Sequence, residues 1–224
     1  MIKISKIFLR APNSDNLVFL LVNACFLLSG FSALLYQSAW LKKLTVVFGS
    51  SSSTVAIVLA AYMGGLALGA AVAARLSNKI ERPIIAYGVL EGLIAVTACL
   101  VPLLLTFAGH FLILLFGGQS DPVAADGIGQ SLYYLIATFI ILSIPTAAMG
   151  ATLPMLARYA ISKDSHIAPR IGLLYSINTL GAVIGTLIAG FFLLPYFGLF
   201  NTLLIGAGVD FAIFLPVSYT HLRA

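Results

Sequence analysis

Residues 52–74 read SSTVAIVLAAYMGGLALGAAVAA, and this stretch contains no charged side chain. A helix needs about 20 apolar residues to cross the roughly 30 Å hydrocarbon layer of a bilayer, so the stretch predicts a transmembrane helix. The whole chain has the same character, because 61% of its 224 residues are hydrophobic and 8% are charged. A soluble domain carries about a quarter charged residues. We therefore exclude a water-soluble domain, a disordered chain and a disulfide scaffold.

The uncharged stretches predict an all-α integral membrane protein, a polytopic bundle of about six transmembrane helices within residues 17–215. Pro195 and Gly198 divide the last long apolar stretch into two spans. Residues 1–16 are expected to form a cytoplasmic N-terminal tail. The expected helices lie near residues 17–39, 52–74, 84–108, 131–157, 171–194 and 199–216.

The basic residues predict the orientation of the bundle, because Lys and Arg collect in cytoplasmic loops. Only Lys42 and Lys43 lie on one side. The basic residues assigned to the other side are Lys3, Lys6, Arg10, Arg75, Lys79, Arg82, Arg158, Lys163 and Arg170. This asymmetry predicts a multi-pass protein of the inner membrane with a cytoplasmic N-terminus, and it also accounts for the net positive charge without a nucleic-acid partner.

The start of the chain has a second interpretation. A basic tail before an apolar run that includes the small residues 29–33 also fits a secretory signal peptide. The uncharged stretch 16–41 is longer than the apolar core of such a peptide, which favours a retained helix. Tyr36 and Trp40 would then belong to the aromatic belt at the membrane interface.

Two of the expected helices carry small residues four positions apart. Helices in lipid approach closely through such residues, so both helices should lie inside the bundle, in generic packing or in a moving seam. The two helix-packing sets are Gly65, Gly69 and Ala73 in the second helix and Gly181, Gly185 and Ala189 in the fifth.

An acid follows each of these sets at a similar distance, Glu91 after Gly69 and Asp210 after Gly185. Three helices followed by three helices of opposite orientation would explain the spacing. This is the 3+3 inverted repeat found inside each half of major facilitator transporters. The pattern favours such a repeat, with the two acids in corresponding third helices.

A carboxylate within a membrane span is costly and by default indicates a functional site. Glu91 and Asp210 are therefore the main candidates for binding a small cation or carrying a proton, with interhelical hydrogen bonding as the alternative. Gln37, Asn178 and Tyr36 are further candidates for substrate binding, or for hydrogen bonds between helices.

Pro145 and Pro154 are expected to break the fourth helix and free backbone carbonyls for a site wall.

No catalytic site, cofactor site or metal site is apparent in the sequence. The three His residues are scattered without a partner at metal-ligand spacing. Residues 126–129 read DGIG, but no strand precedes them, so they predict a turn and not a nucleotide loop. Cys25 and Cys99 sit in apolar runs and are expected to be ordinary helix residues. The expected partners are the lipid bilayer and a small cationic solute.

Four segments together resemble the spermidine-synthase-like membrane proteins, in which a major-facilitator-like domain precedes a polyamine aminopropyltransferase-like domain. The segments are residues 28–37 with Trp40 and residues 48–51, then residues 59–69, then residues 149–154 with Arg158, and finally residues 172–181 continuing through Pro195 and Gly198. The resemblance implies that a catalytic transferase domain lies downstream and is absent from this chain. Residues 216–224 resemble translated sequencing-adapter read-through, so we expect a non-native tail on a C-terminally truncated fragment. Residues 69–83 also resemble the loop between the second and third helices of major facilitators, but Asn78 and Lys79 stand where that loop has an acid and a base.

Three functions follow from these observations. The first is the membrane domain of a spermidine-synthase-like protein, which anchors the enzyme and binds or moves a cation such as a polyamine. The second is a stand-alone transporter half of the facilitator type. The third is a purely structural membrane anchor.

Overall fold

The computed structural model describes residues 14–116, 128–161 and 167–221, and within these ranges it contains helices and no strand. The predicted all-α class is therefore confirmed. The helices are α1 (Ser14–Phe48), α2 (Ser52–Leu76), η2 (Ser77–Lys79), α3 (Pro83–Phe116), α4 (Ile128–Ile161), α5 (Ile167–Ile188), the π-helical turn η3 (Ala189–Leu193) and α6 (Leu194–His221).

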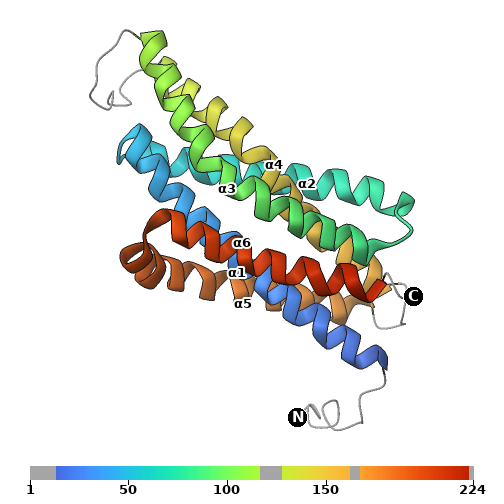
Figure 1. The fold of residues 1–224 in the computed structure, drawn as a ribbon. Coiled ribbons are helices and arrows are strands. Elements are labelled where there is room, and N and C mark those ends of the chain that lie inside the picture. Colours follow the sequence, from blue (N-terminus) through green and yellow to red (C-terminus); the bar gives the residue numbers. More distant parts are fainter. Residues whose placement is uncertain (1–13, 117–127, 162–166, 222–224) are drawn as a thin grey trace, which may run out of the picture.

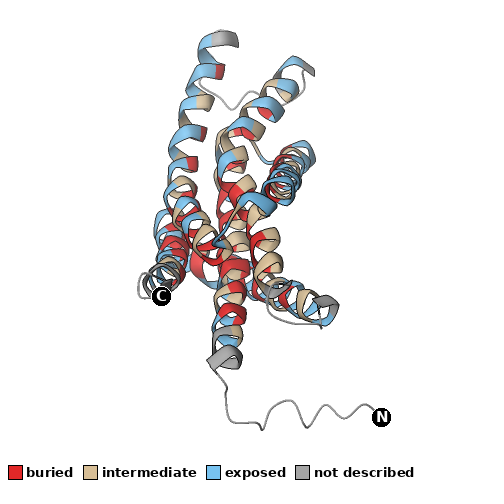
Figure 2. Ribbon diagram, turned by 90° about the vertical axis from the view of Figure 1, so that its right-hand side faces the viewer, coloured by how far each residue is buried: buried red, intermediate tan, exposed pale blue. Residues whose placement is uncertain are grey.

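Five helical segments among the described residues are long and apolar enough to cross a membrane, so the chain is a multi-pass membrane protein. They are Phe19–Phe48, Ser52–Lys79, Pro83–Leu114, Ser131–Tyr159 and Pro169–Leu215. Large apolar side chains such as Leu114 and Phe191 lie on the outside, and the buried residues follow the inward faces of the helices (Figure 2). A bilayer is the solvent that suits such a surface.

The fifth segment turns back on itself at Gly198. The backbone there has φ 74° and ψ 176°, a conformation essentially restricted to glycine. Consequently α5 and α6 run in opposite directions (Figure 1). The sequence placed this break correctly, at the Pro195 to Gly198 turn. At the connection between α1 and α2, the first helix ends before Gly49, whose backbone has φ 87°. Ser51 then caps α2 by accepting a hydrogen bond from the Thr54 amide at 3.1 Å.

We expect Gly198→Ala to lower stability by about 1–3 kcal/mol, because a Cβ strains this backbone conformation. Gly208→Ala in the same helix is the matched control, since nothing lies within 4 Å of a Cβ at Gly208 and its backbone is helical. That change should be neutral or stabilising by up to about 1 kcal/mol. Thermal unfolding in detergent micelles measures both. Equal shifts for the two variants would show that the turn at Gly198 is not a constraint.

The α2–α4 contact is the more extensive of two close helix pairings, and backbone meets backbone there. A Cβ placed on Gly69 would overlap the carbonyl oxygen of Ala147. In return, a Cβ on Gly150 would overlap the carbonyl oxygen of Leu66. The face of α2 that carries Gly65, Gly69 and Ala73 is buried, as the sequence predicted.

The α1–α5 contact is built in the same way. A Cβ on Gly181 would overlap the carbonyl oxygen of Leu27, and a Cβ on Gly30 would overlap the carbonyl oxygen of Asn178. Gly185 meets α1 one turn further along, and Gly181, Gly185 and Ala189 are all buried. The predicted small-residue face of the fifth helix is therefore confirmed as a packing surface. The remaining contacts join α3 to α4, and α6 to α3 and α1.

Several expected helix ends are wrong. The first helix continues through Lys42 and Lys43 to Phe48, the third extends to Phe116 and the last to His221. Leu44 and Phe48 of the first helix and Leu112 of the third are buried beyond the expected ends, so these two helices do not stop at the length that a membrane requires.

Pro145 and Pro154 do not break the fourth helix as expected, because α4 is continuous through both. Each proline removes only one backbone hydrogen bond. Packing against α2 on one side and α3 on the other holds α4 together over these turns. The expectation of a site wall made from an interrupted helix is therefore wrong.

Tyr36 and Trp40 are not interfacial, because both are completely buried in the bundle. The indole of Trp40 stacks on Tyr36 with ring centroids 5.7 Å apart and donates a hydrogen bond to the Ala98 carbonyl at 3.3 Å. About two further turns of α1 follow Trp40, up to Phe48.

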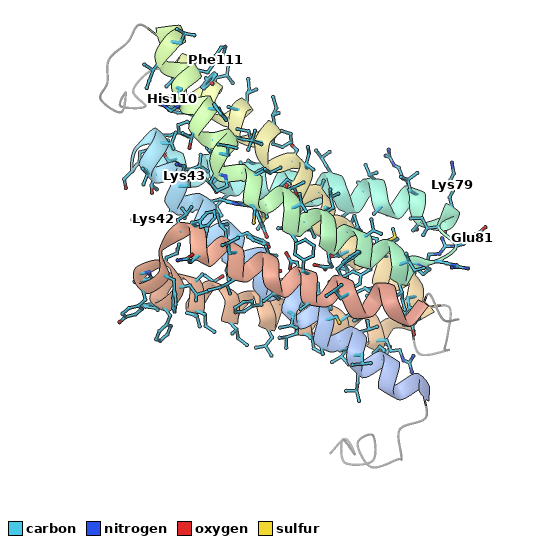
Figure 3. The ribbon with its side chains drawn as sticks, in the orientation of Figure 1. Lys42, Lys43, Lys79, Glu81, His110 and Phe111 are labelled. Carbon is cyan, nitrogen blue, oxygen red and sulfur yellow. The ribbon has the colours of Figure 1, made fainter. Side chains whose placement is uncertain are left out.

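Charged side chains mark the two ends of the bundle (Figure 3). Lys42 and Lys43 lie at one end, together with His110, while Lys79 and Glu81 lie at the other. This agrees with the sequence-based assignment of these residues to opposite sides. Some of the residues discussed above lie outside the described part of the chain. They are the basic residues of the N-terminal tail, the first two residues of the DGIG turn (126–127), Lys163 and residues 222–224.

Candidate functional site

Two acidic side chains are buried near each other inside the bundle, around the junction of α1, α3 and α6. Glu91 comes from α3 and Asp210 from α6, and both have an exposed fraction of 0%. The two carboxyl groups are close enough to interact electrostatically. The sequence marked both residues, and the structure brings them together.

Asp210 is bound by two hydroxyl groups of α1. Tyr36 donates a hydrogen bond from its hydroxyl to Asp210 Oδ2 at 2.7 Å. Ser32 Oγ is hydrogen-bonded to Asp210 Oδ1 and is also 3.0 Å from the carbonyl oxygen of Ser29. The seryl hydroxyl has only one proton, so it cannot donate to both acceptors at once.

This hydrogen-bond pattern suits either protonation state of Asp210. When Asp210 is ionised, Ser32 donates to Oδ1. When Asp210 carries a proton on Oδ1, that proton is donated to Ser32 Oγ, and Ser32 donates to the carbonyl oxygen of Ser29. Gain or loss of one proton at Oδ1, together with one rotation of the Ser32 hydroxyl, therefore exchanges the two arrangements without moving a helix.

Glu91 is different, because neither of its carboxyl oxygens has a hydrogen-bond partner among the described residues. The hydroxyl groups of Ser29 and Tyr87 lie beside it and are the nearest candidate donors, but neither makes a hydrogen bond of normal geometry to it, and the Tyr87 hydroxyl has no such bond to any described residue. Buried polar groups without partners are rare and destabilising. The two carboxyl oxygens of Glu91 are therefore available to accept hydrogen bonds from a ligand or to bind a proton.

No basic side chain lies beside the two acids within the described part of the chain. Lys42, Lys43 and Lys79 lie at the ends of the bundle (Figure 3). The cluster therefore consists of two carboxyl groups and the hydroxyl groups of α1 and α3, with the half-buried thiols of Cys25 near Glu91 and of Cys99 near Asp210. Carboxyl groups without a basic partner favour protons and cations over anions.

Comparisons with known proteins do not add a relative. No family model, curated protein or solved structure matches this chain. Within the described residues, no group of three or more His, Cys, Asp or Glu could hold a metal ion. The chemistry of the site is therefore argued from its own residues.

The other predicted site residues divide into two groups. Tyr36 belongs to the cluster. Gln37 is half-buried, and no described contact joins its side chain to either acid. Asn178 donates to the Phe26 carbonyl at 2.9 Å and so joins α5 to α1, away from the acids.

Sequence reasoning missed three members of the cluster, Ser29, Ser32 and Tyr87. A signal for them was present. Ser29, Ser32 and Tyr36 are spaced three and four residues apart and share one face of α1, and Tyr87 lies one turn before Glu91 on α3. A search for hydroxyl residues at helical spacing from one another or from an acid would have found them.

Proposed function

We propose that this chain is a membrane-integral module that binds a small cation at Glu91 and Asp210 and moves it across the bilayer. The observation that carries the proposal is Glu91, a fully buried carboxyl group that makes no hydrogen bond of normal geometry to any described residue and lies near a second buried acid. A purely structural role would instead require both carboxyl groups to be satisfied by neighbouring helices.

The site favours a proton or an ammonium group as the cation. Glu91 offers two free acceptor atoms, and an ammonium group has protons to donate to them. The resemblance to spermidine-synthase-like membrane proteins suggests a polyamine as the bearer of that group. On this proposal the parent protein carries an aminopropyltransferase-like domain downstream, and the module anchors the enzyme in the inner membrane with a cytoplasmic N-terminus.

We propose further that the bundle has six crossings arranged as two inverted units, α1–α3 and α4–α6. The turn at Gly198 supports the sixth crossing. The helix pairings support the repeat. In such a repeat α1 corresponds to α4, α2 to α5 and α3 to α6. The α2–α4 contact then corresponds to the α5–α1 contact, and the α3–α4 contact corresponds to the α6–α1 contact. The α3–α6 contact corresponds to itself.

The glycine contacts support the same relationship at the level of single residues. Gly69 and Gly150 each face a carbonyl oxygen of the other helix in the α2–α4 pair, and Gly181 and Gly30 do so in the α5–α1 pair. The repeat thus relates Gly69 to Gly181 and Gly150 to Gly30. Glu91 and Asp210 then occupy corresponding third helices, at the contact between the two units.

This arrangement suggests how a closed site could open. In transporters built from inverted repeats, one repeat rocks against the other around a central site. Here the acids come from both units, so rocking about the α3–α6 contact would expose them to one side and then to the other. The close glycine contacts also join the two units and would act as the surfaces about which they pivot.

Equilibrium binding tests the proposal. We expect purified protein to bind spermidine or methylammonium, and we expect Glu91→Gln to weaken binding by about tenfold or more, roughly 1.4 kcal/mol. Glu81→Gln is the matched control, because Glu81 is an exposed acid at the end of the bundle. Isothermal titration calorimetry measures both.

Unchanged affinity in Glu91→Gln would remove Glu91 from the site. The resemblance has a separate test, which is the reading frame of the intact gene. An aminopropyltransferase-like domain beyond residue 215 supports the enzyme-linked module, whereas a second six-helix half supports a facilitator-type transporter.

A further inference from the structure

An apolar groove runs along the bundle between α2 and α3, with α4 as its floor. Its volume is about 550 Å³. The walls are nearly all aliphatic. Residues that form them include Leu68 and Val72 of α2, Leu93 of α3, and Ala147, Ala151 and Met155 of α4. The small residues of α4 make the groove deep, because they leave space between the two flanking helices.

The groove ends at a basic connection between α2 and α3. Its lining reaches Leu76 and Ile80. Arg75, Lys79 and Arg82 are exposed around this end. Arg75 lies one turn after Val72 and therefore shares the face of α2 that lines the groove.

A fourth cation comes from the floor of the groove. Arg158 of α4 reaches across to η2 and donates to Asn78, at 3.3 Å to its carbonyl oxygen and 3.5 Å to Oδ1. Glu81 is the one acid within residues 75–82, so this end of the groove remains positively charged.

We propose that this groove binds one anionic phospholipid, with an acyl chain along α4 and the headgroup phosphate against Arg75, Lys79 and Arg82. Charge complementarity favours this occupant, because basic pockets between transmembrane helices bind anionic headgroups. The dimensions agree. Leu68 to Leu76 spans about 12 Å of helix, close to the roughly 15 Å depth of one leaflet.

The charge also distinguishes this occupant from the alternatives. A zwitterionic lipid, or a helix from a second copy of the chain, would fill the apolar walls but would not need a cluster of basic residues at one end. The inference is independent of the Glu91–Asp210 site, which lies on the other side of α3, among α1 and α6.

Native mass spectrometry of the full chain tests the proposal. We expect palmitoyl-oleoyl phosphatidylglycerol to be retained about tenfold more strongly than the phosphatidylcholine with the same acyl chains. The triple variant Arg75→Gln/Lys79→Gln/Arg82→Gln should lose this preference. Lys42→Gln/Lys43→Gln is the matched control, since it removes charge at the opposite end (Figure 3), and it should keep the preference.

A photoreactive acyl chain on phosphatidylglycerol tests the apolar part. Crosslinks should map to α2, α3 and α4, and Ala151→Phe should reduce them by filling the groove. Three results would overturn the proposal. They are a triple variant that keeps its preference, crosslinks confined to other helices, and a dimer that Ala151→Phe converts to a monomer. Inorganic phosphate that binds as tightly as the lipid would overturn the acyl assignment.

Discussion

Gly69→Val and Gly181→Val should each destabilise the bundle by about 3 kcal/mol or more. The added Cβ would overlap a backbone carbonyl oxygen in both cases, that of Ala147 or that of Leu27. A backbone atom cannot rotate away as a side chain can, so the two helices must separate along their length. Overpacking of a core typically costs about 1–3 kcal/mol, and these contacts allow less relaxation than most. Thermal unfolding in micelles measures the effect.

Gly172→Val is the matched control for this prediction. Gly172 lies in α5, like Gly181, but nothing lies within 4 Å of a Cβ built on it. Its substitution should change stability by less than about 1 kcal/mol. If Gly181→Val proved as mild as Gly172→Val, the α1–α5 contact would not be the close pairing described above. Similar losses for Gly69 and Gly181 are also expected if the two units are related by an inverted repeat.

Much of this architecture follows from the sequence, because lipid restricts the possible structures so strongly. A spanning segment must satisfy its own backbone, so uncharged stretches of sufficient length become helices. Small residues at four-residue spacing then identify the faces that pack, as at Gly65, Gly69 and Ala73. Glycine and proline together located the turn at residue 198. These signals are local, and each depends on one helix alone.

The errors concern properties that depend on neighbouring helices. Pro145 and Pro154 look like helix breakers in isolation, but α2 and α3 hold α4 continuous around them. Tryptophan is common at membrane interfaces, yet Trp40 is buried against α3, where the Ala98 carbonyl accepts a hydrogen bond from its indole, and α1 extends beyond it. Helix length and helix continuity were therefore decided by packing, which one sequence does not contain.

The site shows the same difference between properties of one helix and properties that depend on its neighbours. Glu91 and Asp210 were predictable, because an acid in an apolar span is conspicuous on its own. The packing of α1, α3 and α6 decides that the two acids lie near each other. It also decides that Ser32 and Tyr36 bind Asp210, while Glu91 has no hydrogen-bond partner of normal geometry among the described residues. Residue types in the sequence indicate which groups carry chemistry, and only the packing indicates which of them are satisfied.

Replacing both acids should abolish cation movement and leave the fold intact. We expect Glu91→Gln/Asp210→Asn in proteoliposomes to reduce proton and spermidine flux by at least about 100-fold, since two charge interactions of roughly 1.4 kcal/mol each are removed. The amides keep the size of the acids. The change at Glu91 removes no hydrogen bond among the described residues, whereas the change at Asp210 weakens its bonds with Tyr36 and Ser32. The two effects on stability oppose each other, so the melting temperature of the double variant should change little. A pH-sensitive dye and radiolabelled spermidine report the two fluxes.

The single variants sharpen this test. Glu91→Leu removes a polar group that has no partner in the bundle, so it should raise stability while it abolishes flux. Asp210→Asn should lower flux, and it should also lower stability because Tyr36 and Ser32 lose a charged acceptor. Glu81→Gln should change neither quantity. Full flux in the double variant would exclude the two acids from the transport path. A large loss of stability in Glu91→Leu, with no flux in the unaltered protein, would instead identify the two acids as structural and the chain as a membrane anchor.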